Sequence, residues 1–409
     1  MLMVKTETRD KMGSPLEGVK VLDLADEKAS FCSKLLADLG ASVIKAEKPE
    51  GDASRGFGPF WGEEPHPNRS LFFNYNNMNK LGITLNLEHA EGRSLFRRLI
   101  EKHDIVVETF PPGHLKELGL GFEALSGINE KLILVSVTGF GQNGPRSHYS
   151  SCDIVASAFG GQMYVSGSLS TPPLRPFGDQ SYTTASLYAA MGILLALRRR
   201  RQTGKGEHID ISLQETVVSA LDHVMVRYFY EKVVPGRQGG LSWNNASCIL
   251  PCKNGHIFIT LFPQWETLVE WMASEGMADD LRDDQWRDEA YRRGHIDHIL
   301  QVLKRWTLTH TSDELFELGQ LMHFPWAPVH SPQEVLDNPQ LKARHFFIDV
   351  SHPEIDTPLT YPRAPYQWRS SLERRKRSPR VGEDNVAVYQ EELGLSEEEV
   401  ERLRSIHAI

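Results

Sequence analysis

The sequence predicts an α/β fold, with a large doubly wound domain on a mostly parallel sheet followed by a smaller domain. Three observations support this prediction. The chain has 409 residues, which is more than a single hydrophobic core normally spans. Strand-like and helix-like patterns alternate through the first 215 residues, and a turn-rich break at 235–248 separates them from a second group of elements.

The alternation begins with a short apolar strand at 19–25 and a helix at 29–40, whose apolar residues recur on one face and which ends at Gly40. A long helix is expected to open at Asp179 and to end before "TGKG", after four arginines that suit its negative end. The remaining elements expected in this half are strands at 41–47, 81–87, 104–110, 131–141 and 207–213, and helices at 89–103 and 214–234.

The second half predicts a smaller unit from about Gly255 to His352, which opens with the strand "GHIFITLF". The following Pro- and Arg-rich stretch, 361–380, indicates an extended surface segment. A last helix begins at Ser396, with Glu399 three residues later as in a capping box.

Composition excludes several classes of protein. A net charge of −9 disfavours a nucleic-acid or anionic-membrane partner, and no apolar run free of charges is long enough to cross a membrane. The polar N-terminus is not typical of a secretory signal. Four cysteines in so long a chain favour a reducing compartment, so a cytoplasmic location is expected. Cys248 and Cys252 have no second pair, so they predict structural thiols and no metal site.

Asp179 is the residue for which two interpretations arise. The turn after the first strand, "LADEKAS", lacks the glycines of a dinucleotide site, and no common hydrolase motif is present. "GDQS" before a long apolar helix is typical of an N-capping aspartate. A carboxylate at a helix N-terminus is also held ionised, which is the state that a carboxylate nucleophile needs. The local pattern therefore favours a cap and is compatible with catalysis.

The order of motifs resembles that of the family III CoA-transferases, the formyl-CoA, carnitine and related enzymes, along nearly the whole chain. The segments that carry the resemblance are "LEGVKVLDLA", "KLLADLGASVIKAEKPEGDASR", "NKLGITLNL", "HDIVVETFPPGHLKELGLGFEAL", "SSCDIVASAFGG", "FGDQ" with "GILLALRRRRQTGKGEHIDISL", "APVHSPQEVLDNPQLKARHFF" and "VGEDNVAVYQEELGLSEEEV". The resemblance implies a Rossmann-like CoA-binding domain at 1–220, a linker and small α+β domain at 221–354, and a C-terminal segment at 355–409 that returns to the large domain. It also implies two interlinked protomers.

The resemblance places the catalytic nucleophile at Asp179, which would attack the donor thioester to give a mixed anhydride and then an aspartyl-CoA thioester. Coenzyme A is thereby a substrate, and no permanently bound cofactor is expected. The CoA-binding positions implied are Lys28, Ala29, Lys48, Leu85, Asn86, Thr109, Phe110, Ser150, Ser151, Cys152 and Asp153. A substrate loop is implied at Trp243, Asn244 and Asn245, with an ordinary polar turn as the alternative.

Departures from the family pattern bear on the reaction and on the partners. Cys152 stands where the racemase branch carries an acid/base histidine, so an acyl-CoA racemase or epimerase is the less favoured alternative. Leu81, Pro111 and Glu117 stand where relatives carry arginines, which puts the phosphate contacts in doubt.

"ADEKASFCSKLLADLG" resembles the benzylsuccinate CoA-transferase branch, which implies a bulky or aromatic acceptor acid. It also implies either a homodimer or a hetero-oligomer in which this chain could be a non-catalytic partner.

Overall fold

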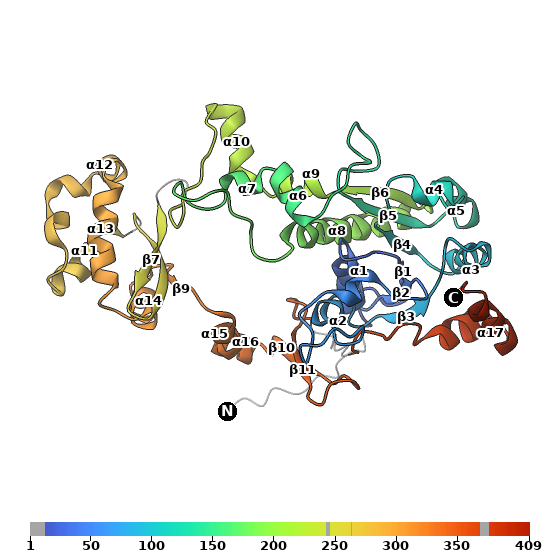
Figure 1. The fold of residues 1–409 in the computed structure, drawn as a ribbon. Coiled ribbons are helices and arrows are strands. Elements are labelled where there is room, and N and C mark those ends of the chain that lie inside the picture. Colours follow the sequence, from blue (N-terminus) through green and yellow to red (C-terminus); the bar gives the residue numbers. More distant parts are fainter. Residues whose placement is uncertain (1–12, 243–245, 263, 369–375) are drawn as a thin grey trace. The chain divides into compact units, whose positions relative to one another are not determined.

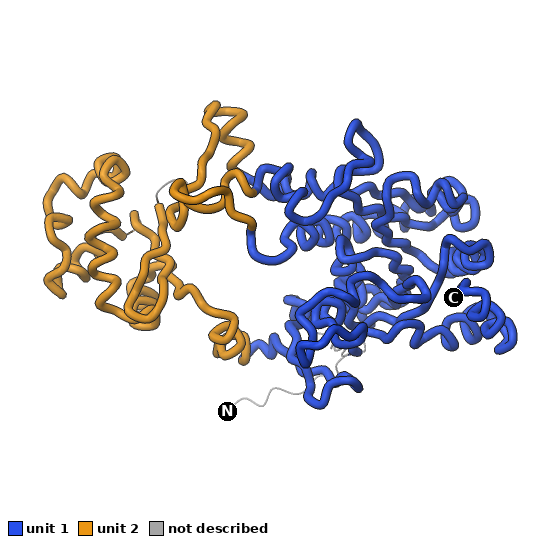
Figure 2. The backbone as a smooth tube through the Cα atoms, in the orientation of Figure 1, with its two compact units in different colours: residues 1–162, 176–222, 343–409 blue, residues 163–175, 223–342 orange. Residues whose placement is uncertain are grey.

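The computed structural model describes residues 13–242, 246–262, 264–368 and 376–409. The chain divides into two compact units, shown in different colours in Figure 2. The first unit consists of residues 1–162, 176–222 and 343–409, and the second consists of 163–175 and 223–342. The chain therefore enters the second unit twice and returns to the first at its C-terminal end. The boundaries expected from the sequence at 220 and 354 stay predictions.

The first unit is built on a six-stranded sheet in the order β3-β2-β1-β4-β5-β6 (Figure 1). All five strand pairs are parallel, with Leu22 opposite Ile44 on one side and Val106 on the other. This arrangement confirms the predicted α/β class. The strands are β1 Lys20–Asp23, β2 Ser42–Glu47, β3 Leu81–Thr84, β4 Ile105–Glu108, β5 Ile133–Thr138 and β6 Glu207–Ser212.

Helices cover both faces of the sheet because successive strand residues point to opposite sides. Val21 belongs to the core under α1 and α8, whereas its neighbour Leu22 belongs to the core under α3 and α5. The helices of this unit are α1 Ser30–Asp38, η1 Ala53–Gly56, α2 Leu71–Asn76, α3 Ala90–Ile100, α4 His114–Glu117, α5 Phe122–Ile128, α6 Asp153–Phe159, α8 Gln180–Thr203 and α9 Leu213–Ser219.

Helix α8 is the longest element and carries its buried residues at four-residue spacing. Ala185, Ala189 and Ile193 are buried against the sheet, and small side chains allow this close approach. The helix ends at Gly204, which adopts φ 73° and donates its N–H to the Arg200 carbonyl at 2.8 Å. Glycine adopts this left-handed conformation without a steric penalty, so the "TGKG" stop behaves as expected.

The C-terminal segment packs on the free edge of the sheet, beside β3. The Tyr389 hydroxyl donates to the Thr84 carbonyl at 2.6 Å, and the Thr84 N–H donates to the Asn385 side chain at 2.9 Å. The segment contains the hairpin β10 Phe347–Val350 and β11 Leu359–Pro362, the π-helical turn η4 Ala387–Glu392 and the helix α17 Glu397–Ser405. The predicted capping box of Ser396 and Glu399 is present at the start of α17.

The second unit has a three-stranded antiparallel sheet of β7, β8 and β9 with its own core. Its elements are α10 Asp222–Glu231, β7 Ser247–Cys252, β8 Gly255–Thr260, α11 Trp265–Ser274, η2 Asp279–Arg282, η3 Asp284–Arg287, α12 Glu289–Gly294, α13 Ile296–Thr307, α14 Ser312–Leu321, β9 Ala327–Pro328 and α15 Pro332–Asp337. The short helices α7 Gln162–Val165 and α16 Pro339–Ala343 lie where the chain passes between the units.

The structure corrects one predicted element. The expected continuous helix over 214–234 is two helices, α9 and α10, with a break at Ala220 and Leu221. The Ala220 N–H is shared between the carbonyls of Thr216 and Val217, which tightens the last turn and ends α9. Asp222 then starts α10, where a carboxylate suits the positive end of a helix.

Candidate active site

A pocket of about 840 Å³ opens within the first unit at the carboxyl ends of the parallel strands. Its lining begins at Leu24 after β1, Lys48 after β2, Leu85 after β3, Thr109 after β4 and Thr138 at the end of β5. The pocket therefore includes the point between β1 and β4 where the strand order reverses. Loops diverge there in open α/β sheets and leave room for a ligand.

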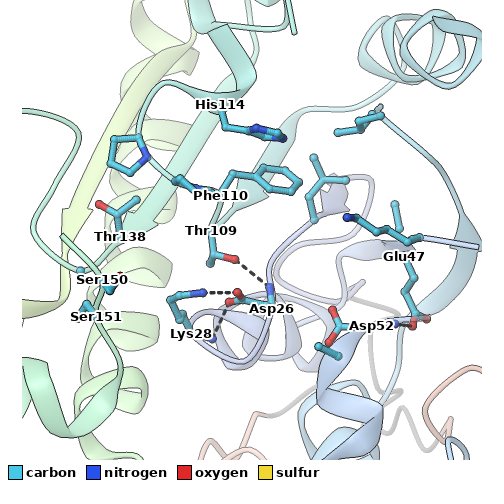
Figure 3. A pocket seen from close by; sticks show the side chains of 18 of the residues that line it. Asp26, Lys28, Glu47, Asp52, Thr109, Phe110, His114, Thr138, Ser150 and Ser151 are labelled. Atoms are coloured by element: carbon cyan, nitrogen blue, oxygen red, sulfur yellow. Dashed lines mark hydrogen bonds and ion pairs between the residues drawn. The ribbon is translucent and has the colours of Figure 1, made fainter. Parts of the chain in front are cut away.

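Seven of the eleven predicted CoA-binding residues line this pocket. Figure 3 shows Lys28 and Thr109 both next to Asp26, and Phe110 beside His114. The Thr109 hydroxyl accepts a hydrogen bond from the Asp26 N–H at 2.9 Å, which joins the β1 and β4 turns. The seven lining residues are Lys28, Lys48, Leu85, Thr109, Phe110, Ser150 and Ser151.

The other four predicted residues lie next to the pocket and are not among its lining residues. Ala29 is fully buried at the start of α1, and Cys152 is the exposed residue before α6. The Asn86 side chain donates to the His407 carbonyl at 3.0 Å, so it contacts the C-terminal segment. Asp153 is buried and contacts the start of α8. The loop residues Trp243, Asn244 and Asn245 lie outside the described residues.

Acidic side chains of the pocket lining are paired with basic ones. Asp26 pairs with Lys28, and Glu88 lies 3.4 Å from the His114 ring. Glu47 accepts from Arg55 at 2.6 and 2.7 Å.

Asp52 pairs with the buried Lys45 at 2.8 Å, and this ammonium group lowers the pKa of Asp52 to about 2 although burial acts in the opposite direction. Among the lining residues that the structure describes, Lys48 is a lysine with no acidic side chain in ion-pair contact. An anionic ligand would therefore find an uncompensated positive charge at Lys48.

Glu108 is the buried last residue of β4 and directly precedes the pocket-lining residue Thr109. Burial raises the pKa of this carboxyl to about 7, and hydrogen bonds from Ser136 and from the Phe110 backbone oppose the increase only partly. The Phe110 N–H donates to Glu108 at 2.7 Å, and the Phe110 ring lies 5.0 Å from that of His114. A buried acid with a raised pKa thus accepts the backbone N–H of one pocket aromatic.

Sequence reasoning missed several lining residues, of which Thr138 and His114 are the clearest. The hydroxyl oxygens of Thr138 and Ser151 are buried and have no hydrogen-bond partner in the part of the chain that the structure describes. A Cβ on Gly139 would come within 2.3 Å of the Ser151 Cβ, so only glycine lets the two loops approach this closely. The position of Thr138 at the end of a predicted parallel strand could have identified it.

Asp179 occupies the N-cap position of α8, but its side chain does not cap the helix. The expectation of a capping side chain is therefore wrong, and the reason lies elsewhere in the fold. Asp153 Oδ1 accepts the Ser181 N–H at 2.8 Å, which is one of the amides that an N-cap side chain would otherwise serve. Asp179 is half-buried and follows Gly178, which has φ 76°.

Among the residues that the structure describes, the two cysteines of β7 do not belong to a metal-binding group. Cys248 and Cys252 are buried in β7, and burial raises the pKa of the Cys248 thiol to about 12. The described residues contain no group of three or more side chains placed to hold a metal ion. Among the helices that are described, each is too short or too polar to span a bilayer.

Comparison with known proteins gives a family and a fold. Residues 16–385 match the family described as CoA-transferase family III. The chain is 32% identical to succinyl-CoA:(R)-benzylsuccinate CoA-transferase subunit BbsE of Thauera aromatica, over 97% of this chain and 99% of that protein. It is 31% identical to succinyl-CoA–D-citramalate CoA-transferase of Chloroflexus aurantiacus, over 97% and 98%. The crystal structure of a CAIB/BAIF family protein from Brucella suis matches with a TM-score of 0.84 at 29% identity, over 93% of this chain and all of that one.

Proposed function

This chain belongs to CoA-transferase family III, and we propose that it moves CoA from an acyl-CoA donor to a carboxylic acid with Asp179 as the nucleophile. One observation supports this most directly. Ser150 and Ser151 line the pocket, and Asp153, two residues later, contacts the helix turn that Asp179 begins. A short segment thus joins the pocket edge to a contact with the start of α8.

In the proposed reaction, the Asp179 carboxylate attacks the donor carbonyl, and CoA leaves as the thiolate. The thiolate then attacks the aspartyl carbonyl of the mixed anhydride, which releases the donor acid and leaves an aspartyl-CoA thioester. The acceptor carboxylate attacks that thioester and expels the thiolate again. The thiolate finally attacks the acceptor carbonyl, which yields the new acyl-CoA and restores the carboxylate. No net proton transfer is needed.

The pocket supplies binding energy that compensates for a weak nucleophile. A carboxylate attacks a thioester slowly in water, so most of the rate enhancement must come from positioning. We propose that Lys48 contacts a CoA phosphate, because it is an exposed lining cation without an acidic partner among the described residues. Thr138 and Ser151 are proposed to hydrogen-bond the pantetheine chain through their otherwise unpartnered hydroxyls.

The acceptor is proposed to be a bulky or aromatic acid. Phe177, two residues before Asp179, is 98% exposed in the single chain. An exposed aromatic ring beside the nucleophile gains stability when an apolar group or a second protomer covers it. The name of the benzylsuccinate relative points to the same class of acceptor. Measuring CoA transfer from succinyl-CoA to benzylsuccinate, to citramalate and to oxalate tests the proposed preference for a bulky or aromatic acceptor.

The assembly is proposed to be an interlinked dimer, formed by two copies or with a paralogous subunit. Helix α8 exposes a row of large apolar side chains that a monomer would leave in water, and an interface would bury them. They are Leu187, Tyr188, Met191, Leu194 and Leu195. Measuring the mass and activity of the purified chain alone separates a homodimeric enzyme from a subunit that needs a paralogue.

The experiment that tests the proposed chemistry is the substitution Asp179→Ala. Transfer should be abolished, and hydroxylamine trapping with acyl-CoA should label Asp179 only in the natural protein. Asp356→Ala, at an exposed aspartate in the β10–β11 connection, is the matched control and should keep full activity. Transfer that survives Asp179→Ala would overturn the mechanism. Deuterium exchange at the α-carbon of the acyl group would instead indicate an epimerase.

A further inference from the structure

The pocket wall that follows β3 is held by residues from the C-terminal segment. The Asn86 N–H donates to the Ala408 carbonyl at 2.9 Å, and the Asn86 side-chain amide donates to the His407 carbonyl at 3.0 Å. Asn86 is not itself among the pocket-lining residues. Three of its neighbours are, namely Leu85, Leu87 and Glu88. One asparagine therefore joins the wall of the pocket to a segment 321 positions away in the sequence.

The two carbonyls that Asn86 contacts are oriented by the way in which helix α17 ends. The His407 N–H donates to the Arg404 carbonyl at 3.0 Å. The Ala408 N–H donates to the Leu403 carbonyl at 2.9 Å, and these two bonds together form a Schellman motif. His407 is exposed and adopts φ 55°, the left-handed conformation that glycine usually supplies in this motif. The backbone turn at His407 therefore presents both carbonyls to Asn86.

A glycine in α3 lets the pocket wall and the C-terminal segment meet on the surface of that helix. A Cβ on Gly92 would come within 1.9 Å of the Asn86 carbonyl oxygen and 3.3 Å of the Ala408 oxygen. One turn further into the contact, the Arg93 side chain donates to the Glu88 carbonyl at 2.9 Å. Because closely packed groups leave little space for independent movement, a shift of the C-terminal segment should displace the wall.

We propose that Asn86 is a positioning residue that couples the docking of residues 403–409 to the affinity of the pocket for its ligand. The inference rests on the proposed function, in which this pocket holds the CoA part of the substrate. It gives Asn86 a task different from the CoA contact that the family resemblance implies. Because coupling between two sites is reciprocal, a docked C-terminal segment tightens CoA binding, and bound CoA tightens the docking of the segment.

The contacts of Asn86 favour positioning over direct binding. Both ends of its side-chain amide are engaged within the protein, since the nitrogen donates to the His407 carbonyl and the oxygen accepts the Glu88 N–H at 3.0 Å. The buried side chains of Leu85 and Leu87 line the pocket instead. A residue that sets the position of such a wall affects how tightly the substrate is held and does not touch the reacting atoms. Its loss should therefore change KM and leave kcat.

The substitution Asn86→Ala removes both side-chain bonds. The Kd of free CoA, measured by titration calorimetry, and the KM for acyl-CoA should each rise about tenfold, while kcat stays within about twofold. Asn129→Ala is the matched control, because the Asn129 amide donates to the Ile100 and His103 carbonyls at 3.1 and 2.9 Å. Its oxygen accepts the Lys131 N–H at 3.0 Å, in a turn that does not line the pocket. This control should lose similar stability and keep the Kd and the KM.

A second pair of variants acts through the backbone turn and leaves Asn86 intact. His407→Gly removes an exposed side chain and keeps the left-handed conformation, so CoA affinity should be retained. His407→Val places a β-branched residue at φ 55°, which is strongly disfavoured, so the turn should open and the Kd should rise severalfold. Unchanged affinity in His407→Val would overturn the proposal, and so would an effect of Asn129→Ala as large as that of Asn86→Ala.

Hydrogen exchange measures the coupling in the opposite direction and needs no transfer reaction. Saturating CoA should slow amide exchange in α17 of the natural protein but not in Asn86→Ala. Equal protection in both proteins, or none in the natural protein, would overturn the inference. Failure of CoA to bind the natural protein would overturn the inference and the proposed function together, whereas coupled CoA binding without acyl transfer would contradict only the proposed function.

Discussion

Glu108 gives the sharpest prediction about pH, because its carboxyl is buried at the end of β4 with a pKa raised to about 7 from an ordinary 4.5. The folded protein holds this proton up to about pH 7, whereas the unfolded chain releases it near pH 4.5. The contribution of Glu108 to the free energy of unfolding is therefore fully present below pH 4.5 and is lost as the pH rises through 7. At about 1.4 kcal/mol per pKa unit, the loss amounts to about 3 kcal/mol.

Glu108→Gln removes the titration while keeping an oxygen that can accept the Phe110 N–H. We expect the Tm of the natural protein to fall relative to that of the variant between pH 5 and pH 8.5. For a unit of this size, each kcal/mol of stability changes the Tm by about 2 °C or more. The Tm difference between the natural protein and Glu108→Gln should therefore reach about 6 °C. Differential scanning fluorimetry across the pH range measures it.

The control for this prediction is Glu130→Gln, which removes an exposed carboxyl and should follow the natural protein at every pH. Parallel pH profiles for the natural protein and Glu108→Gln would refute the reasoning, because they would mean that burial does not hold the proton on Glu108.

Three further predictions concern the pocket and its surroundings. Lys48→Ala should raise the KM for acyl-CoA roughly tenfold and leave kcat nearly unchanged, because it removes one charge-assisted phosphate contact. Asp52→Asn leaves the buried ammonium group of Lys45 without its acidic partner, so urea unfolding should show a loss of about 3–5 kcal/mol. Gly82→Ala places a Cβ within 2.6 Å of Pro379, so it should lower stability by about 1–3 kcal/mol and speed proteolysis of the C-terminal segment.

Matched substitutions serve as controls for the first and the third of these predictions. Lys205→Ala removes an exposed lysine after α8 and should leave the KM unchanged. Gly127→Ala adds a methyl group in α5 where nothing lies within 4 Å, so it should not destabilise the unit. An increase in KM with Lys205→Ala, or a stable Asp52→Asn variant, would contradict the respective argument.

The sequence by itself determined the α/β class, because alternating faces and helical periods are local properties of the chain. Val21 and Leu22 belong to opposite layers, as the apolar run of the first strand requires in a sheet covered on both sides. The family followed from the order of motifs and is confirmed by the match over residues 16–385. The stop at Gly204 and the capping box of α17 were also readable, since each depends on residues within one helical turn.

Only the tertiary structure decided how the groups around Asp179 share their hydrogen bonds. The local pattern predicts a capping aspartate, and no local pattern reveals that Asp153 supplies that bond from 28 residues away. The same holds for His114 and Thr138, which reach one pocket because five parallel strands end at the same edge. The break between α9 and α10 was likewise invisible, because an amphipathic period can continue across a short interruption. Contacts between distant segments depend on the packed fold, and a sequence pattern records only near neighbours.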